Sequence, residues 1–404
     1  MKITTCLITV LSMCMNVAAQ KFVVNYDEAK IPAYTLPDPL EGISSAADWP
    51  ARREAIRTLI AKEMFGHVPS HTATLEIVPD TQPFMILDGK AIVSQPAIKI
   101  AGTTWDLMIV RPANPSRPPP AFIAYNFGGN HSVIPDRGVR LPVSWQRKAK
   151  NHKAQEADRG SSARRWDVAA LMEAGYALVT LYYGDVDPDM NDGFRDGVHA
   201  HFGVPKPDEW GSIATWAWGL SKTLDYLVAS KIVDAERVSV LGHSRLGKTS
   251  LWAGANDERF ALVISNNSGC GGAALSKRAF GETVGLINTS FPHWFNGNFK
   301  KYNRNESAMP FDSHMLLALI APRPLYVASA EQDRWADPHG EFLACVGADP
   351  VYRLLGTEGL PSRKMPKVNE PTVGRIGYHI RSGKHDVTAY DWAQYIAFAN
   401  KHLN

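Results

Sequence analysis

The chain has 404 residues, of which 45% are hydrophobic and 21% charged, and its 43 Lys and Arg against 40 Asp and Glu give a formal charge of +3. This composition is typical of a globular protein and excludes a collagen-like or disordered one. The near-balanced charge gives no argument for nucleic acid or an anionic membrane as a partner. The length allows two or three domains, or one large α/β domain.

The first twenty residues have the pattern of a secretory signal peptide. A positive start at Lys2 is followed by an apolar run at 7–17 and by small residues that end at Ala19. The run is shorter than the ~20 residues that span a membrane. We therefore predict a signal peptide at 1–19 and a secreted or periplasmic mature chain at 20–404, without a membrane span.

The predicted mature chain contains two cysteines, Cys270 and Cys345. An oxidising compartment would allow them to form a disulfide. The sequence does not show whether their Cα atoms lie close enough, so the pairing stays open.

The first part of the chain predicts a surface segment, a helix and three strands. Residues 21–39 carry three prolines and indicate an extended surface segment. Apolar residues at helical spacing predict a helix over 49–65. Strand-like runs follow at 91–100, 104–111 and 121–127.

Strands and helices alternate through the rest of the chain. Helical patterns occupy 168–174, 213–230, 246–256 and 387–402, and apolar strand runs occupy 176–182, 237–241, 261–265, 325–329 and 376–381. Continuous apolar strands separated by helices predict an α/β fold with a mostly parallel sheet covered on both faces. The irregular stretch 269–310 is expected to lie over the functional edge of that sheet. We predict that residues 20–404 form a single catalytic domain.

The segment 238–248 points to a nucleophile. An apolar strand runs into Gly242-His243-Ser244, and a helix starts directly afterwards. This order is typical of a nucleophile elbow, where glycines such as Gly242 and Gly247 prevent collisions at the tight turn. The helix N-terminus favours the negative charge that develops on the reacting carbonyl. The alternative is that Ser244 is an ordinary helix N-cap.

A nucleophilic serine needs a histidine base and an orienting carboxylate. His385 precedes the closing helix, where a hydrolase histidine belongs, whereas His379 lies within a strand and is expected to be structural. Asp333 follows the strand at 325–329, the usual position of the acid. Glu331 and Asp337 compete with Asp333, which otherwise caps a turn.

Several motifs give the sequence a specific resemblance. They are GHSRLGK at 242–248, SGCGG at 268–272, FPHWF at 291–295, PFDSH at 310–314, APRP at 321–324, AEQDRWADP at 330–338 and GKHD at 383–386. With them the chain resembles the glucuronoyl esterases of carbohydrate esterase family 15, particularly the bacterial members. The resemblance implies an α/β-hydrolase three-layer sandwich with an N-terminal extension. We expect a monomer that needs no cofactor and no metal.

The resemblance also bears on the acid and the oxyanion. Many family members carry a glutamate 23 residues after the serine, where this chain has Asn267, which cannot carry a negative charge. Some bacterial relatives have an aspartate at the position of Asp333, so we assign the acid there. The backbone N–H of Arg245 is a natural oxyanion donor, and the resemblance implies that its side chain also stabilises the oxyanion. Residues 128–130 either supply a second donor or form a plain turn.

Three further residues match the sugar-binding positions of the family. Lys248 lies one helical turn after Ser244 and shares its face. The resemblance implies that Lys248 and Glu282 contact glucuronate hydroxyls and that Trp335 packs on the sugar. The alternatives are a solvated lysine, a loop carboxylate and a core aromatic.

These observations predict a serine carboxylic-ester hydrolase. The resemblance implies cleavage of the ester between 4-O-methyl-glucuronate of glucuronoxylan and lignin alcohols. One alternative is an acetyl xylan esterase or another carbohydrate esterase. Another is a non-catalytic glycan-binding protein, which Asn267 favours and which Ser244, His385 and Asp333 oppose.

Overall fold

A single twisted sheet runs through the protein. The computed structural model describes residues 23–69, 73–80 and 82–403, so the predicted signal peptide lies outside the described residues. The strands of the described part are β1 (Glu76–Val78), β2 (Phe84–Ile86), β3 (Ala91–Ser94), β4 (Ala97–Ile100), β5 (Thr103–Pro112), β6 (Ala121–Asn126), β7 (Ala177–Tyr182), β8 (Val238–His243), β9 (Leu262–Asn266), β10 (Leu325–Ala330), β11 (Thr372–Val373) and β12 (Ile376–Arg381).

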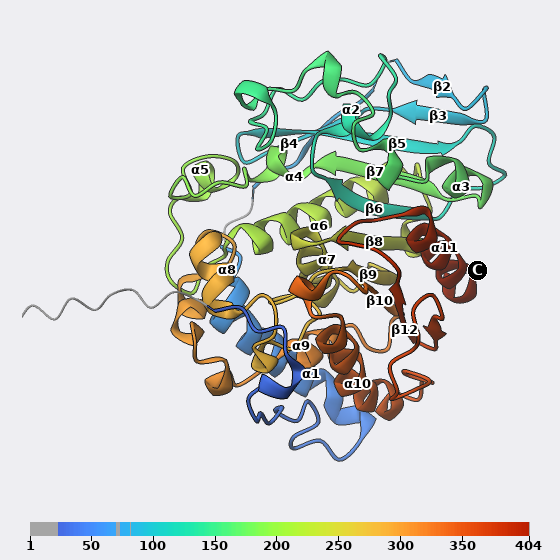
Figure 1. The fold of residues 1–404 in the computed structure, drawn as a ribbon. Helices are drawn as coiled ribbons and strands as arrows, with labels where there is room; N and C mark the ends of the chain where they lie inside the picture. Colours follow the sequence, from blue (N-terminus) through green and yellow to red (C-terminus); the bar gives the residue numbers. More distant parts are fainter. Residues whose placement is uncertain (1–22, 70–72, 81, 404) are drawn as a thin grey trace, which may run out of the picture.

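Helices cover both faces of this sheet (Figure 1). Those of the described part are α1 (Trp49–Ile60), α2 (Asn130–Val133), α3 (Val168–Glu173), α4 (Tyr183–Val186), α5 (His199–Phe202), α6 (Ser212–Ser230), α7 (Arg245–Asn256), α8 (Val284–Ser290), α9 (Ser313–Ala318), α10 (Pro338–Leu354) and α11 (Ala389–Leu403). Within the residues described, none of these helices has the length and apolar character needed to cross a membrane.

The sheet is parallel in its centre and antiparallel at its edges. The strand order is β1-β4-β5-β7-β6-β8-β9-β10-β12-β11, with β3 pairing β5 and β2 pairing β3. The strands from β7 to β12 along this order run parallel, as predicted. The first five strands pair antiparallel. Short turns join β2 to β3 and β4 to β5, as an antiparallel pair allows. The sheet as a whole is therefore mixed.

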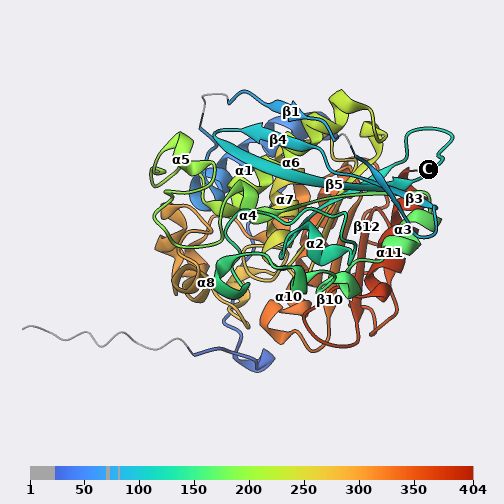
Figure 2. The same cartoon turned by 90° about the horizontal axis from the view of Figure 1, so that it is seen from above.

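Alternate residues of each central strand enter the two opposite cores. In β10, Leu325 and Val327 pack in the core under α6, α7, α9 and α10. Tyr326 and Ala328 pack in the core under α3 and α11. This period of two places one helix layer on each face. Figure 2 shows α3 and α11 next to each other on one face, so the prediction of three layers is confirmed.

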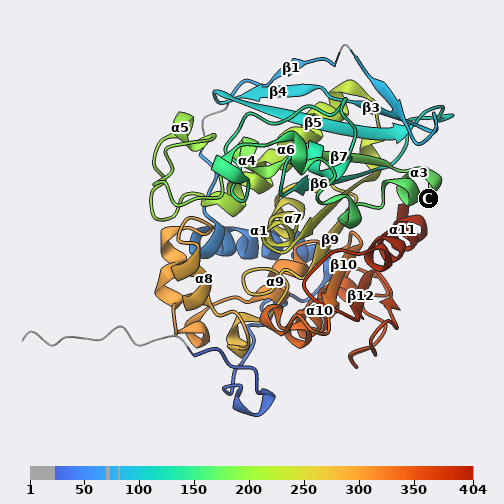
Figure 3. The same cartoon turned by 45° about the horizontal axis from the view of Figure 1, so that its top comes forward.

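Two details of the predicted elements differ in the structure. The run at 91–100 is divided into β3 and β4, because Pro96 has no N–H for a ladder bond. The structure contains the helix α10, which the sequence does not predict because a proline, Pro350, lies inside its pattern. The N-terminal surface segment is as expected, and Figure 3 shows it beneath α8 and α10.

Candidate active site

The turn after β8 places Ser244 at a sharp bend. Ser244 has φ 60° and ψ −128°, and α7 begins at the next residue. A Cβ atom on Gly242 would lie 1.8 Å from the carbonyl oxygen of Leu246, so only glycine fits there. The Ser244 side chain makes no cap hydrogen bond to α7. Ser244 thus stands at the N-cap position of α7 in a strained backbone conformation, but its side chain does not cap the helix as an ordinary N-cap serine would.

Asp333 and His385 meet beside this serine. His385 Nδ1 lies 2.6 Å from Asp333 Oδ2. The two loops that carry them are joined, since the N–H of Gln332 donates to the carbonyl of Gly383 at 3.0 Å. Asp333 is buried, while the His385 side chain is 40% exposed. The pair can hold an imidazole with its second nitrogen free for a proton transfer.

The other candidates for these positions have different partners. Glu331 is exposed, and Asp337 pairs with Arg278 at 2.8 Å. His379 is buried with its Nε2 3.0 Å from Asp391, which confirms its structural role. Asp333 is therefore the one of the three candidate carboxylates that contacts His385.

Asn267 lies in the same cluster as Asp333. Its side-chain amide donates to Asp333 Oδ2 at 2.8 Å, the oxygen that faces His385. Asn267 ends up there because it follows β9, which pairs with β10. Asn267 thus holds the carboxylate that contacts His385.

A cavity of about 300 Å³ opens beside Ser244. Its wall contains two cations and two carboxylates, and we call it the balanced cavity. Those four residues are Arg245, Lys248, Glu282 and Asp333, and Ser244, Trp335 and His385 also line it.

The balanced cavity contains the three predicted sugar-binding residues. The ammonium of Lys248 donates to the carbonyl of Ser268 at 2.5 Å and lies 3.5 Å from Glu282. Both side chains are buried, so neither is a solvated surface group. Trp335 is 39% exposed, so it is not a core aromatic. The cavity therefore offers a donor, an acceptor and a ring face.

A buried carboxylate, Asp189, holds the side chain of Arg245. It contacts the guanidinium groups of Arg245 and Arg147. Its Oδ1 accepts from His293 at 2.9 Å and from Trp294 at 2.8 Å. Burial alone would raise the pKa of Asp189, but these hydrogen bonds and the two guanidinium charges outweigh it and hold the pKa well below its usual value.

Aromatic rings also contact the side chain of Arg245. Its guanidinium carbon lies 4.5 Å from the ring centre of Trp294 and 5.3 Å from that of Phe291. Those two rings stack at 3.7 Å. The sequence gives no signal for Asp189, because this residue lies in an irregular segment before α6 with no fixed spacing to Ser244. The motif at 291–295 is visible in the sequence, but its contact with this arginine depends on the tertiary structure.

A second buried acid, Glu341 on α10, supports the wall of the balanced cavity. It accepts hydrogen bonds from the backbone N–H of Ser268 at 2.8 Å and of Gly269 at 3.0 Å. The hydroxyl of Ser329 lies 2.5 Å from its other oxygen. Burial raises the pKa of Glu341 to about 8, with a further rise from the charge of Asp333 and a partial offset from the hydrogen bonds.

A second cavity, of about 190 Å³, shares Ser244, Arg245 and His385 with the first. Besides Arg245 it is lined by Arg147, Lys148 and Arg165, and no carboxylate lines it. We call it the cationic cavity. The aromatic rings of Phe127 and Tyr183 form its apolar wall.

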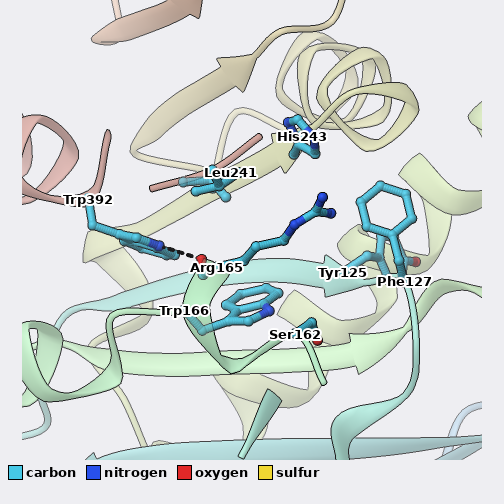
Figure 4. A pocket seen from close by; sticks show the side chains of 9 residues that line it. Tyr125, Phe127, Ser162, Arg165, Trp166, Leu241, His243 and Trp392 are labelled. Atoms are coloured by element: carbon cyan, nitrogen blue, oxygen red, sulfur yellow. Dashed lines mark hydrogen bonds between the residues drawn. The ribbon is translucent and has the colours of Figure 1, made fainter. Parts of the chain in front are cut away.

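Figure 4 shows a neighbouring pocket that shares Phe127, Arg165 and His243 with the cationic cavity. The carbonyl of Arg165 accepts a hydrogen bond from the indole of Trp392 at 2.8 Å, while the guanidinium of the same residue extends between His243 and Phe127. His243 is buried, and its ring centre lies 4.5 Å from that of His385. Burial, followed by the charges of His385 and Arg165, lowers the pKa of His243 well below its ordinary value.

The remaining candidates lie away from the two cavities. Residues 128–130 line neither cavity, and Ser132 donates to the carbonyl of Gly129 at 3.0 Å through its N–H, which favours the plain turn. Cys270 and Cys345 are separate buried thiols. Across the part of the chain that the structure describes, no group of three or more His, Cys, Asp or Glu is placed to hold a metal ion.

The chain is similar to known proteins along most of its length. A family model for the fungal glucuronyl esterases matches residues 165–356. The carbohydrate esterase MZ0003 of an unknown prokaryotic organism is 48% identical, over 96% of this chain and 94% of its own length. A solved glucuronoyl esterase from Solibacter usitatus is 45% identical with a TM-score of 0.88, and the match covers 93% of this chain and 100% of that one.

A solved CE15 esterase from a marine bacterial metagenome is also similar. It is 48% identical with a TM-score of 0.88, over 94% of this chain and 100% of that one. These likenesses cover almost the whole chain and confirm the predicted α/β-hydrolase fold. The chain belongs to carbohydrate esterase family 15, the glucuronoyl esterases, which are carboxylic ester hydrolases.

Proposed function

We propose that the protein hydrolyses esters of glucuronate, with Ser244 as nucleophile, His385 as general base and Asp333 as the acid that orients it. One observation carries this proposal: His385 lines both cavities together with the strained serine, and its Nδ1 lies 2.6 Å from Asp333, which lines the balanced cavity. No hydrogen bond joins Ser244 to His385 among the described residues, which is common before a substrate tightens the geometry.

The reaction follows the two-step course of serine esterases. His385 takes the Ser244 proton while the serine oxygen attacks the C6 ester carbonyl of the glucuronate. The oxyanion is stabilised by the backbone N–H of Arg245 and by its guanidinium, which Asp189 and Trp294 hold in place. The alcohol leaves with the proton of His385. Water, deprotonated by His385, then attacks the acyl-enzyme, and glucuronate is released.

We assign the sugar to the balanced cavity. Lys248 and Glu282 are placed to hydrogen-bond its hydroxyls, and the exposed face of Trp335 is placed to pack on its ring. Related fungal proteins, among them that of Wolfiporia cocos at 28% identity over 84% of this chain, are named 4-O-methyl-glucuronoyl methylesterases. A 4-O-methyl-glucuronate ester of glucuronoxylan, with a lignin alcohol, is therefore the proposed substrate.

The proposal is tested by comparing benzyl glucuronate with an acetylated xylo-oligosaccharide. Native protein should hydrolyse the glucuronate ester faster, and Ser244→Ala should hydrolyse neither. Equal rates for native protein and Ser244→Ala would contradict the assignment of Ser244 as nucleophile and would favour a glycan-binding protein. Faster release of acetate would favour an acetyl xylan esterase.

We also propose that residues 1–19 direct export and that residues 20–404 act as one monomeric domain. The charge pattern of the first residues supports the first part, and the single sheet of the described residues supports the second. N-terminal sequencing of exported protein should give Gln20 as the first residue. Light scattering should give the mass of one chain.

A further inference from the structure

The segment between α2 and α3 carries an unusual share of the positive charge. Residues 137–165 contain nine Lys and Arg but two Asp and Glu, whereas the whole chain has a net charge of +3. The remaining chain is therefore slightly acidic. The positive charge is concentrated on the segment that forms a wall beside Ser244.

Three of these cations line the cationic cavity, namely Arg147, Lys148 and Arg165. Two nearby carboxylates compensate them in part. Asp189 is shared by Arg147 and Arg245, and Asp386 is shared by Arg164 and Arg165. Each carboxylate therefore faces two guanidinium groups, which leaves a positive excess at both sites.

Lys148 has no carboxylate of its own. It is exposed, and it forms no ion pair with any residue that the structure describes. An ammonium without a partner at the rim of a cavity remains available to an anion of a ligand. The balanced cavity differs, since Lys248 there lies 3.5 Å from Glu282.

The relative position of the two cavities determines which part of a substrate lies next to the positive charge of the cationic cavity. They share Ser244, Arg245 and His385, so an ester whose carbonyl lies at Ser244 has room for one substituent in each cavity. If the uronate occupies the balanced cavity, as under the proposed function, the alcohol lies in the cationic cavity. Phe127 and Tyr183, whose ring centres are 5.6 Å apart, offer that alcohol an aromatic wall.

We propose that the cationic cavity selects esters whose alcohol is an aryl alcohol bearing a carboxylate, with Lys148 and Arg165 binding that carboxylate. The proposal rests on the assignment of the uronate to the balanced cavity. It makes Lys148 a specificity-determining residue on the alcohol side. A carboxylate of the alcohol in the cationic cavity would compensate the positive charge that the described carboxylates leave unpaired.

Three glucuronate esters of nearly equal size test it: 4-carboxybenzyl, 4-carbamoylbenzyl and 4-(aminomethyl)benzyl. For native protein at low ionic strength we expect kcat/KM to be about tenfold higher for the carboxylate than for the amide, and lowest for the amine. The preference should shrink to about twofold at 0.5 M salt, because the cavity is open to solvent. 4-(Hydroxymethyl)benzoate should inhibit more strongly than benzyl alcohol.

The variant Lys148→Gln should reduce the ratio between carboxylate and amide esters to about twofold, and Lys148→Glu should reverse it. Lys364→Gln, an exposed lysine that lines neither cavity, is the matched control and should keep the native ratio. A ratio near one in native protein, or a ratio that Lys148→Glu leaves unchanged, overturns the inference. If benzyl glucuronate itself is not hydrolysed, the proposed function fails and this inference with it. If it is hydrolysed without discrimination by charge, the inference alone fails.

Discussion

The two cavities that meet at Ser244 differ in how their charges are satisfied. In the balanced cavity each cation has a carboxylate or carbonyl partner, and Lys248, Glu282 and Asp333 are buried. The wall of the cationic cavity contains four cations and no carboxylate. Its three arginines share Asp189 and Asp386 behind the wall, and the exposed Lys148 forms no ion pair among the described residues. Satisfied buried groups keep one geometry, whereas unpaired exposed charges attract whatever anion is present.

This difference indicates that the two cavities bind different parts of the substrate in the proposed reaction. A sugar has many hydroxyls at fixed positions, so its recognition requires a rigid set of donors and acceptors. The alcohol leaves during the reaction, so loose binding through charge is sufficient on that side. Four predictions test the comparison of the two cavities. They begin with the serine that lines both cavities and end with a lysine that lines only the balanced one.

The largest effect is expected for Ser244, which both cavities share. Ser244→Ala should lower kcat about 10⁵-fold for charged and neutral esters alike, because no acyl-enzyme can form. Steady-state kinetics on benzyl glucuronate measures this, with an unchanged thermal unfolding curve as the control. A loss confined to one class of ester would contradict a shared nucleophile.

Asp333→Asn should lower kcat by about 10³ to 10⁴, since the imidazole loses the charge that orients and stabilises it. Adding Asn267→Asp to the Asp333→Asn variant should raise its kcat again by at least about tenfold. The new carboxylate would stand in the same cluster, since Asn267 lies 2.8 Å from Asp333 Oδ2. Full activity of Asp333→Asn would show that the acid is another residue.

The third prediction concerns Glu341 behind the balanced cavity. Its pKa rises from 4.5 to about 8 on folding, so the folded state binds the proton more tightly. Its contribution to stability is thus complete below pH 4.5 and is lost as the pH rises towards 8, by up to about 5 kcal/mol. Chemical denaturation of native protein and Glu341→Gln across this range should show a flatter profile for the variant. Parallel profiles would contradict a neutral Glu341.

The smallest of the four effects is expected for Lys248, which lines the balanced cavity but not the cationic one. Lys248→Met should lower kcat/KM for benzyl glucuronate relative to 4-nitrophenyl acetate by about 10- to 100-fold, the value of one or two charge-assisted hydrogen bonds. Lys222→Met on α6 is the control and should leave this ratio as it is. An unchanged ratio in Lys248→Met would remove the lysine from sugar recognition.

Much of the fold could be predicted because the central strands are continuous apolar runs. The runs that became β7, β8, β9, β10 and β12 were placed to within about two residues at either end. The antiparallel edge could not be predicted, because β1 and β2 are three residues each and show no clear alternation. Helix α10, which carries Glu341, could not be predicted because Pro350 interrupts its helical pattern.

The candidate site divides in the same way. Ser244, Asp333 and His385 each follow a strand, and parallel strands bring their carboxyl ends to one edge. Lys248 followed from helical spacing. Asp189 and Lys148 take their places from loops, whose path depends on contacts with the rest of the molecule.

The sequence alone determined the strand–serine–helix turn, the order of the triad candidates and the family resemblance, because these depend on local spacing. The tertiary structure decided that Asn267 supports Asp333, that Asp189 holds Arg245 and that two cavities of different charge meet at one serine. Those facts depend on distances between segments far apart in the chain. Spacing along a chain cannot encode such distances, since only the packed sheet and its loops fix which charges face each other.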